Sequence, residues 1–193
     1  MSTGQLTAPG MHELIGPEEM QRTLWRLACE LREHHPDEEV ILCGIVTRGA
    51  FLAARLLQLI HAQGGGQWAG ITLDIGPYRD DEPRHTPAPT TTPFPLPFAA
   101  PESVRDRVVV LVDDVLFHGR TGRAALAALG ELGRPRAVEL LVLVDRGHRE
   151  LPLRATYVGR NLPTSEGERV LVRLAECDER DAVFLRSSAE APA

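Results

Sequence analysis

Two adjacent carboxylates, Asp113 and Asp114, directly follow the apolar segment 108–112. Six residues after Asp113, the segment Gly-Arg-Thr-Gly at 119–122 opens a stretch with helical periodicity. Open parallel sheets place ligands at the carboxyl ends of their strands, and the amides at a helix N-terminus, with the Thr121 hydroxyl, suit a phosphate group. Because carboxylates repel a bare anion, the pattern favours a ligand that offers hydroxyls to the acids and a phosphate to the turn. A ribose 5-phosphate has both.

Two other interpretations of this segment are less favoured. Asp113 and Asp114 could form a polar strand end beside a helix cap, but the Gly-Arg-Thr-Gly extension argues against it. A phosphate loop of the Gly-Lys-Ser type is disfavoured because the 21 basic residues are all arginine. Any cationic side chain that binds phosphate here, histidine aside, is therefore a planar guanidinium, which suits bidentate contacts.

Alternating apolar segments predict the elements that position these residues. Apolar residues recur at helical spacing from Met20 to Leu31, and the segment 34–36 ends that helix. Because strand and helix alternate, the strands must pair in parallel through right-handed crossovers, which predicts an α/β protein with a central, mostly parallel sheet flanked by helices and a small β-containing hood. The predicted strands are 40–45, 71–75, 108–112, 137–144, 157–158, 170–174 and 182–185, and the further helices are 50–63 and 121–132.

The chain is predicted to form a single domain at 14–186, between flexible tails at 1–13 and 187–193. The segment 83–101 contains seven prolines, which excludes a packed helix or a central strand. A loop of this length inside a compact domain is typical of a lid. We therefore expect a flexible lid loop at about 76–103.

Composition narrows the class of protein. The 193 residues are 43% hydrophobic and 25% charged, as in an ordinary globular domain, and the net charge of −6 excludes a surface that binds polyanions without selectivity. We find neither an apolar run long enough to span a bilayer nor a leader-like start, so we expect a cytoplasmic protein without membrane contact.

The remaining chemically active side chains have plain interpretations. Three cysteines, an odd number at wide spacing, indicate buried thiols in a reducing compartment rather than disulfides or a zinc site. Asp145 and Arg146 could form a structural ion pair at a strand end. His34, His35, His61 and His85 lack metal-ligand spacing and are interpreted as surface residues.

Six segments, in order along the chain, carry a resemblance to a known family. They are 44–49, 73–75, 78–81, 110–122, 144–152 and 157–165. The apolar strand, paired acids and small-residue loop resemble type I phosphoribosyltransferases. The six together are similar to the pyrimidine operon attenuation regulators that have uracil phosphoribosyltransferase activity. The resemblance spans about 14–185 and implies the type I phosphoribosyltransferase fold.

The resemblance implies transfer of the ribosyl 5-phosphate of PRPP to uracil, which gives UMP and pyrophosphate. Mg²⁺ would be carried by PRPP near Asp113 and Asp114, rather than held by protein side chains alone. The implied catalytic residues are Asp113, Asp114, Arg48 and Arg79. By the same resemblance, Asp113 and Asp114 contact the ribose hydroxyls, and the 5-phosphate is bound by His118, Gly119, Arg120, Thr121 and Gly122. Pyrophosphate is bound by Thr47, Arg48, Gly49 and Arg79. Uracil is bound in the hood by Val158, Gly159 and Asn161.

The family also binds the leader of pyrimidine-operon messenger RNA and assembles as dimers or larger homo-oligomers. The candidate RNA contacts in this chain are Arg26, His148, Arg149, Arg154 and Arg160, although each could equally be a solvated surface residue.

The sequence departs from the family at several of these positions. His118 replaces a small hydroxyl residue, Gly122 replaces a branched aliphatic one, and Trp25 and Cys29 replace small polar and histidine residues. Two alternatives therefore stay open: a regulator with weak or vestigial catalysis, and a phosphoribosyltransferase for another base such as a purine.

Overall fold

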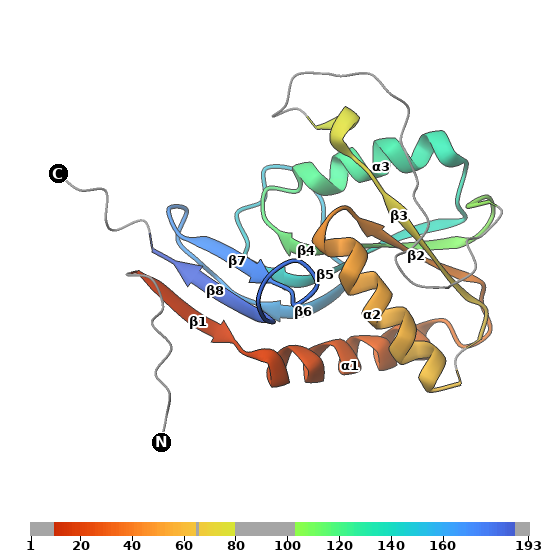
Figure 1. Cartoon of the computed structure of the whole chain (residues 1–193). Coiled ribbons are helices and arrows are strands. Elements are labelled where there is room, and N and C mark those ends of the chain that lie inside the picture. Colours follow the sequence, from red (N-terminus) through yellow and green to blue (C-terminus); the bar gives the residue numbers. More distant parts are fainter. Residues whose placement is uncertain (1–9, 65, 80–102, 188–193) are drawn as a thin grey trace.

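The computed structural model describes residues 10–64, 66–79 and 103–187 (Figure 1). Its centre is a five-stranded parallel sheet in the order β3-β2-β4-β5-β6. β2 is buried along its whole length, as its unbroken apolar sequence predicts for a strand covered on both faces. The five strands are β2 (Val40–Ile45), β3 (Trp68–Leu73), β4 (Val108–Leu116), β5 (Ala137–Asp145) and β6 (Tyr157–Asn161).

Helices cover both faces of this sheet. The first face packs against α1 (Pro17–His34) and α2 (Arg48–Ala62), whose apolar residues share one core with Val108, Val110 and Val112. The second face packs against α3 (Arg120–Leu132) and the short 3₁₀ helix η1 (Gly76–Tyr78). Figure 1 shows α3 on the opposite side of the sheet from α1 and α2. None of the described helices is long and apolar enough to cross a membrane.

A smaller antiparallel sheet, the hood, stands at one end of the molecule. Its order is β1-β8-β7, formed by β1 (Met11–Ile15), β7 (Arg169–Arg173) and β8 (Ala182–Arg186). Segments from the two ends of the chain therefore pair with each other (Figure 1). The prediction of an α/β protein with a central parallel sheet and a smaller β-containing part is confirmed.

Several predicted boundaries differ from the structure. β1 begins at Met11, inside the segment expected to be a flexible tail, because its backbone pairs with β8. β6 was expected in the hood, yet it forms an edge of the main sheet, where Tyr157 pairs with Leu141 and is fully buried. α2 begins at Arg48 rather than at residue 50. Residues 1–9, 188–193 and most of the predicted lid, 80–102, lie outside the described residues.

The three cysteines are free, and they differ in burial. Cys43, inside β2, is fully buried, and this burial raises its pKa to about 12. Cys29 is half-buried, while Cys177 is exposed. The expectation of three buried thiols is therefore correct only for Cys43.

His35 is buried, and its interpretation as a surface residue is wrong. Its Nδ1 lies 2.7 Å from Glu38 Oε2, and its Nε2 lies 3.0 Å from Glu139 Oε2. The hydroxyl of Tyr157 donates to the same Glu139 oxygen at 2.8 Å. This network ties the end of α1 to β5 and β6, at the amino ends of the strands. His34 and His61 are exposed as predicted, and His85 lies outside the described residues.

We expect Tyr157→Phe to lower the free energy of unfolding by about 1–3 kcal/mol, because a carboxylate loses a buried donor. Urea denaturation measures this loss. Tyr78→Phe is the matched control, because Tyr78 is half-exposed and its hydroxyl bonds Glu131. Removing this hydroxyl should lower the free energy of unfolding by no more than about 0.5 kcal/mol. Equal losses in the two variants would contradict a stabilising role for the network.

Candidate active site

The strand order reverses between β2 and β4. These strands are neighbours, but the chain continues from β2 outward to β3, whereas the strands after β4 extend the sheet in the other direction. α2 after β2 and α3 after β4 accordingly cover opposite faces. Open α/β sheets bind ligands in the crevice at such a reversal, outside the carboxyl ends of the strands. The candidate residues that follow β2 and those at the end of β4 meet there.

Asp113 and Asp114 lie within β4, which continues to Leu116, so they do not terminate the strand as the sequence suggested. Asp113 Oδ1 accepts the Asp114 amide at 3.0 Å, and Asp114 Oδ1 accepts the Val115 amide at 2.9 Å. The two side chains interact with each other, and each also has its own cationic neighbour: Arg79 acts electrostatically on Asp113, and Arg48 acts on Asp114.

The two carboxyls resist ionisation. Burial raises the pKa of Asp113 well above its usual range, and the neighbouring Asp114 charge raises it further. Burial also raises the pKa of Asp114, while the Arg48 guanidinium opposes the shift. A ligand that brings positive charge to this point favours the ionised forms of both groups.

The start of α2 lies directly against the acidic pair. A Cβ atom on Gly49 would stand 2.2 Å from the carbonyl oxygen of Val112, so only glycine allows this approach. The preceding peptide, Val46–Thr47, is cis. The packing of α2 on β4 thus brings the start of α2, with Arg48, to the carboxylates.

One nitrogen of the Arg48 guanidinium is hydrogen-bonded to a carboxylate, and another has no partner. Its Nη2 lies 3.2 and 3.1 Å from the two carboxylate oxygens of Asp178, which follows β7. Its Nε is buried and has no hydrogen-bond partner within the described part of the chain. A buried guanidinium donor without a partner fits an anionic ligand oxygen.

Residues 117–119 join β4 to α3, and this segment with the start of α3 is the predicted phosphate loop. Gly119 has a φ of 91°, a left-handed conformation that favours glycine, and it precedes the first turn of α3. Gly122 is buried, and a Cβ atom there would stand 3.2 Å from Leu153 Cδ1, so the helix start packs closely against the β5–β6 connection. Arg120 and His118 both face the carboxylate of Glu150 in that connection.

Arg79 follows η1 at the carboxyl end of β3. The carbonyl oxygen of Tyr78 accepts a hydrogen bond from Arg123 Nη2 of α3 at 3.2 Å, which holds η1 against that helix. Arg79 is therefore positioned beside the acidic pair even though the rest of the predicted lid lies outside the described residues.

The three residues assigned to uracil lie on β6, the edge strand of the main sheet, and not in the hood. Val158 and Gly159 are half-buried, whereas Asn161 is exposed. Arg26 Nη2 donates to the carbonyl oxygens of Val158 at 3.0 Å and of Gly159 at 2.7 Å. Arg26 thus holds β6 against α1, which is a structural use of a residue expected at the RNA surface.

The other candidate RNA residues divide into two groups. Arg149 is directed inward: it pairs with Asp145 and donates to the carbonyls of Phe117 and Leu153 at 2.6 and 3.1 Å. Arg160 pairs with Glu19 and is exposed. His148 and Arg154 are exposed on the β5–β6 connection.

The alternative of an Asp145–Arg146 ion pair is wrong. The partner of Asp145 is Arg149, whereas Arg146 is buried over the ring of Phe117, 3.8 Å from its centroid. Sequence reasoning gave no role to Phe117, Glu150 or Asp178. The resemblance covers Phe117 and Glu150, but nothing in the local pattern of the sequence marks Asp178.

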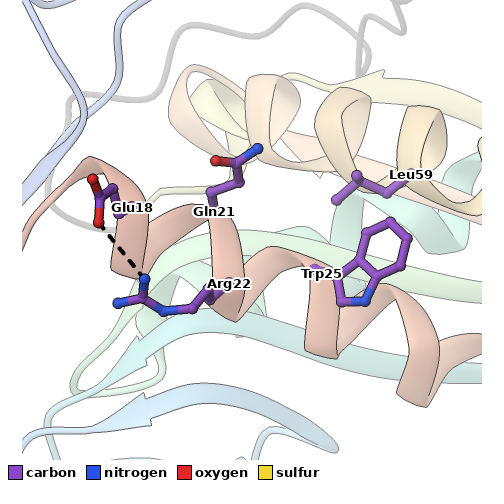
Figure 2. A pocket seen from close by; sticks show the side chains of 5 residues that line it. All are labelled: Glu18, Gln21, Arg22, Trp25 and Leu59. Carbon is purple, nitrogen blue, oxygen red and sulfur yellow. Dashed lines mark ion pairs between the residues drawn. The ribbon is translucent and has the colours of Figure 1, made fainter.

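A surface pocket of about 390 Å³ lies away from these residues, between α1 and α2. Figure 2 shows Trp25 and Leu59 facing each other across it, and Trp25 is 49% exposed. Its rim carries the Glu18–Arg22 ion pair at 3.8 Å. Within the described part of the chain, no cluster of three or more His, Cys, Asp or Glu side chains is arranged to hold a metal ion.

Comparison with known proteins agrees with this geometry. A family model for the phosphoribosyl transferase domain matches residues 17–173. The Bifunctional protein PyrR of Streptomyces coelicolor is 51% identical over 181 residues, which cover 93% of this chain and 91% of that protein. The Bifunctional protein PyrR of Chloroflexus aurantiacus is 47% identical over 179 residues, which cover 92% and 96%.

Solved structures share the fold at lower sequence identity. A hypoxanthine phosphoribosyltransferase from Staphylococcus aureus has a TM-score of 0.67 and 18% identity and covers 94% of each chain. The enzyme from Trypanosoma cruzi in complex with IMP has a TM-score of 0.66 and 15% identity, with the same coverage. The expected type I phosphoribosyltransferase fold is confirmed.

We expect Asp113→Asn to raise the melting temperature near neutral pH. The folded state raises the pKa of Asp113, so it binds more protons than the unfolded state, and the parent protein loses stability as pH rises. Asparagine avoids this loss, and each kcal/mol recovered raises the melting temperature by about 2–4 °C.

The difference in melting temperature between Asp113→Asn and the parent should become smaller toward about pH 4, where an unfolded aspartate also becomes protonated. Differential scanning calorimetry across this pH range measures the difference. Asp37→Asn, at an exposed position, is the control for the charge change and should show no such trend. A variant less stable than its parent near neutral pH would contradict the expectation.

Proposed function

Because the chain belongs to the phosphoribosyl transferase domain family and, within it, to the family of the bifunctional PyrR proteins, we propose that it transfers the phosphoribosyl group of PRPP to uracil. The products are UMP and pyrophosphate. The same protein regulates a pyrimidine operon by binding its messenger RNA. The observation that carries the enzymatic part is the desolvated Asp113–Asp114 pair, set between Arg48 and Arg79 beside a phosphate loop.

Each part of PRPP has a counterpart in the site. The amides of residues 119–122 and the start of α3 bind the 5-phosphate. Asp113 and Asp114 accept hydrogen bonds from the ribose hydroxyls. Arg48, through its free Nε, and Arg79 bind the pyrophosphate group. Val158, Gly159 and Asn161, which lie on β6, are assigned to the base.

The reaction replaces one bond at ribose C1. The bond from C1 to the pyrophosphate oxygen breaks with its electron pair on the oxygen, and uracil N1 forms the new bond to C1 and loses its proton. Positive charge develops on the ribose ring as the old bond lengthens. Asp113 and Asp114 stabilise this charge, because desolvated carboxylates act strongly at short range in a medium of low dielectric constant. Arg48 and Arg79 stabilise the negative charge on the leaving group.

The two carboxylates also fit Mg²⁺, which prefers oxygen ligands and keeps several waters while it binds substrate phosphates. Asp113 and Asp114 would hold the ion with PRPP, and the bound ion would supply charge neutralisation of the pyrophosphate. The raised pKa of Asp113 fits this role, because a carboxylate poised against ionisation gains most from an incoming cation.

The test is release of pyrophosphate with uracil and PRPP. We expect release that requires both, and Asp114→Asn to lower kcat by about 10²–10³-fold, the usual loss when one charge-stabilising group is removed from an active site. Hypoxanthine in place of uracil tests the alternative of a purine substrate. An inactive parent protein, or an Asp114→Asn variant with parental activity, would refute the proposed reaction.

The regulatory part uses exposed residues of the β5–β6 connection and of β6. Because Arg26 and Arg149 each donate to more than one backbone carbonyl, we assign the RNA contacts to His148, Arg154 and Arg160. Arginine and histidine side chains can bind phosphates and stack on unpaired bases of a hairpin loop.

We expect Arg154→Ala to weaken binding of the pyrimidine-operon leader and to reduce the slope of log K against log salt by about 1, the effect of one lost phosphate contact. Filter retention over a series of salt concentrations, with and without UMP, measures this. Pyrophosphate release should be unchanged in this variant. Arg149→Ala should impair both activities, since Arg149 anchors the phosphate loop. An unchanged salt slope for Arg154→Ala would remove it from the RNA surface.

A further inference from the structure

A carboxylate occupies the cationic groups of the phosphate loop. Glu150 Oε2 accepts from Arg120 Nε at 3.0 Å and from Arg120 Nη2 at 2.5 Å. The other oxygen, Oε1, lies 3.3 Å from Nδ1 of His118. Both carboxylate oxygens therefore face side chains of residues that the resemblance assigns to the 5-phosphate.

The backbone fixes the point from which the Glu150 side chain extends. The amides of Glu150 and Leu151 both donate to the carbonyl oxygen of His118 at 3.1 Å. The β5–β6 connection is thus joined to the phosphate loop by its main chain, and the Glu150 side chain extends across the loop. The carboxylate position follows from the fold and not from a chance surface encounter.

The His118 ring is held toward Glu150 from its other side. It stacks on Phe117 with ring centroids 3.5 Å apart, and the guanidinium of Arg146 lies on Phe117 at 3.8 Å. The resemblance places a small hydroxyl residue at position 118 in relatives. Histidine gives the carboxylate a second nitrogen partner that a short hydroxyl residue would not supply at the same place.

Glu150 is a negative charge among several positively charged or basic side chains. The loop and the start of α3 contribute His118, Arg120 and Arg123, and the connection contributes Arg146, His148 and Arg149. Asp145 is engaged with Arg149. A carboxylate and a phosphate dianion take the same bidentate partner, so they cannot share the Arg120 fork. An entering 5-phosphate must displace Glu150 or bind against its charge.

We propose that Glu150 is a positioning residue that holds His118 and Arg120 before ligand binds and competes with the 5-phosphate for them. This inference rests on the proposed function, because it concerns the phosphate subsite of that same site. Glu150 is exposed, so its side chain can turn into solvent when the phosphate takes its place. The competition lowers the affinity for every ligand that carries the 5-phosphate, and it leaves ligands without that group unaffected.

The experiment compares UMP with uridine, which lacks the phosphate, by isothermal titration calorimetry. We expect Glu150→Gln to tighten UMP binding by about two- to fivefold, the effect of one exposed charge pair, with uridine affinity unchanged. In turnover, KM for PRPP should fall while kcat stays constant. Glu150→Asp, which keeps the charge, should retain the parental ratio of UMP to uridine affinity. Glu33→Gln, at an exposed position on α1, is the control for net charge and should match the parent.

A second measurement needs no variant at position 150. In the parent protein, NMR signals of the His118 ring, assigned by their loss in His118→Gln, should shift with UMP and not with uridine. If UMP binds the parent but Glu150→Gln leaves the ratio unchanged or weakens both ligands alike, the competition is refuted and the proposed function stands. His118 signals that do not respond to UMP refute it equally. If the parent binds neither UMP nor PRPP, the proposed function itself fails.

Discussion

The partial burial of two adjacent carboxyls near the carboxyl end of the central strand is the constraint around which the rest of the site is arranged. A charged group removed from water must be paired or must neutralise. Asp113 and Asp114 receive amide hydrogen bonds from β4, and Arg48 and Arg79 approach from neighbouring strand ends, yet both pKa values remain raised. The folded protein therefore maintains a site whose charge is incompletely balanced. In the proposed reaction, the positive charge that develops on the ribose completes that balance.

Close packing of backbone keeps this arrangement in register. Gly49 allows α2 to contact β4 at Val112, and Gly159 allows β6 to approach β5, where a Cβ atom would stand 2.4 Å from the carbonyl oxygen of Leu143. Arg149 then ties the loop after β4 to the β5–β6 connection through carbonyl oxygens. A side chain that the sequence analysis named as a candidate RNA contact thus stabilises the phosphate loop. A variant at Arg149 would change RNA binding through the fold, so it cannot by itself locate the RNA surface.

The sequence analysis predicted correctly those elements that are determined by neighbouring residues along the chain. The apolar run of β2 and the boundaries of α3 follow from periodicity and from Gly133, and the acid pair and its phosphate loop are contiguous in sequence. The errors concern partners that are distant along the chain. His35 reads as a surface residue until β5 and β6 bring Glu139 and Tyr157 to it. β1 has no apolar run of its own and forms because β8 offers a strand edge.

The basic residues of the chain are all arginine and its net charge is negative, and the contacts in the site connect these two features. Arg48 faces Asp178, Arg120 faces Glu150 and Arg149 faces Asp145, so guanidinium groups around the crevice carry carboxylate partners within the protein. Such pairs keep a cationic site from binding anions without selectivity, because protein carboxylates already balance part of its positive charge. Selectivity then depends on ligands that meet several groups of the site at once. In the proposed function, a ribose with a 5-phosphate at one end and a pyrophosphate at the other meets the loop before α3 and Arg48 while its hydroxyls reach Asp113 and Asp114, whereas a simple phosphate meets only one of these groups.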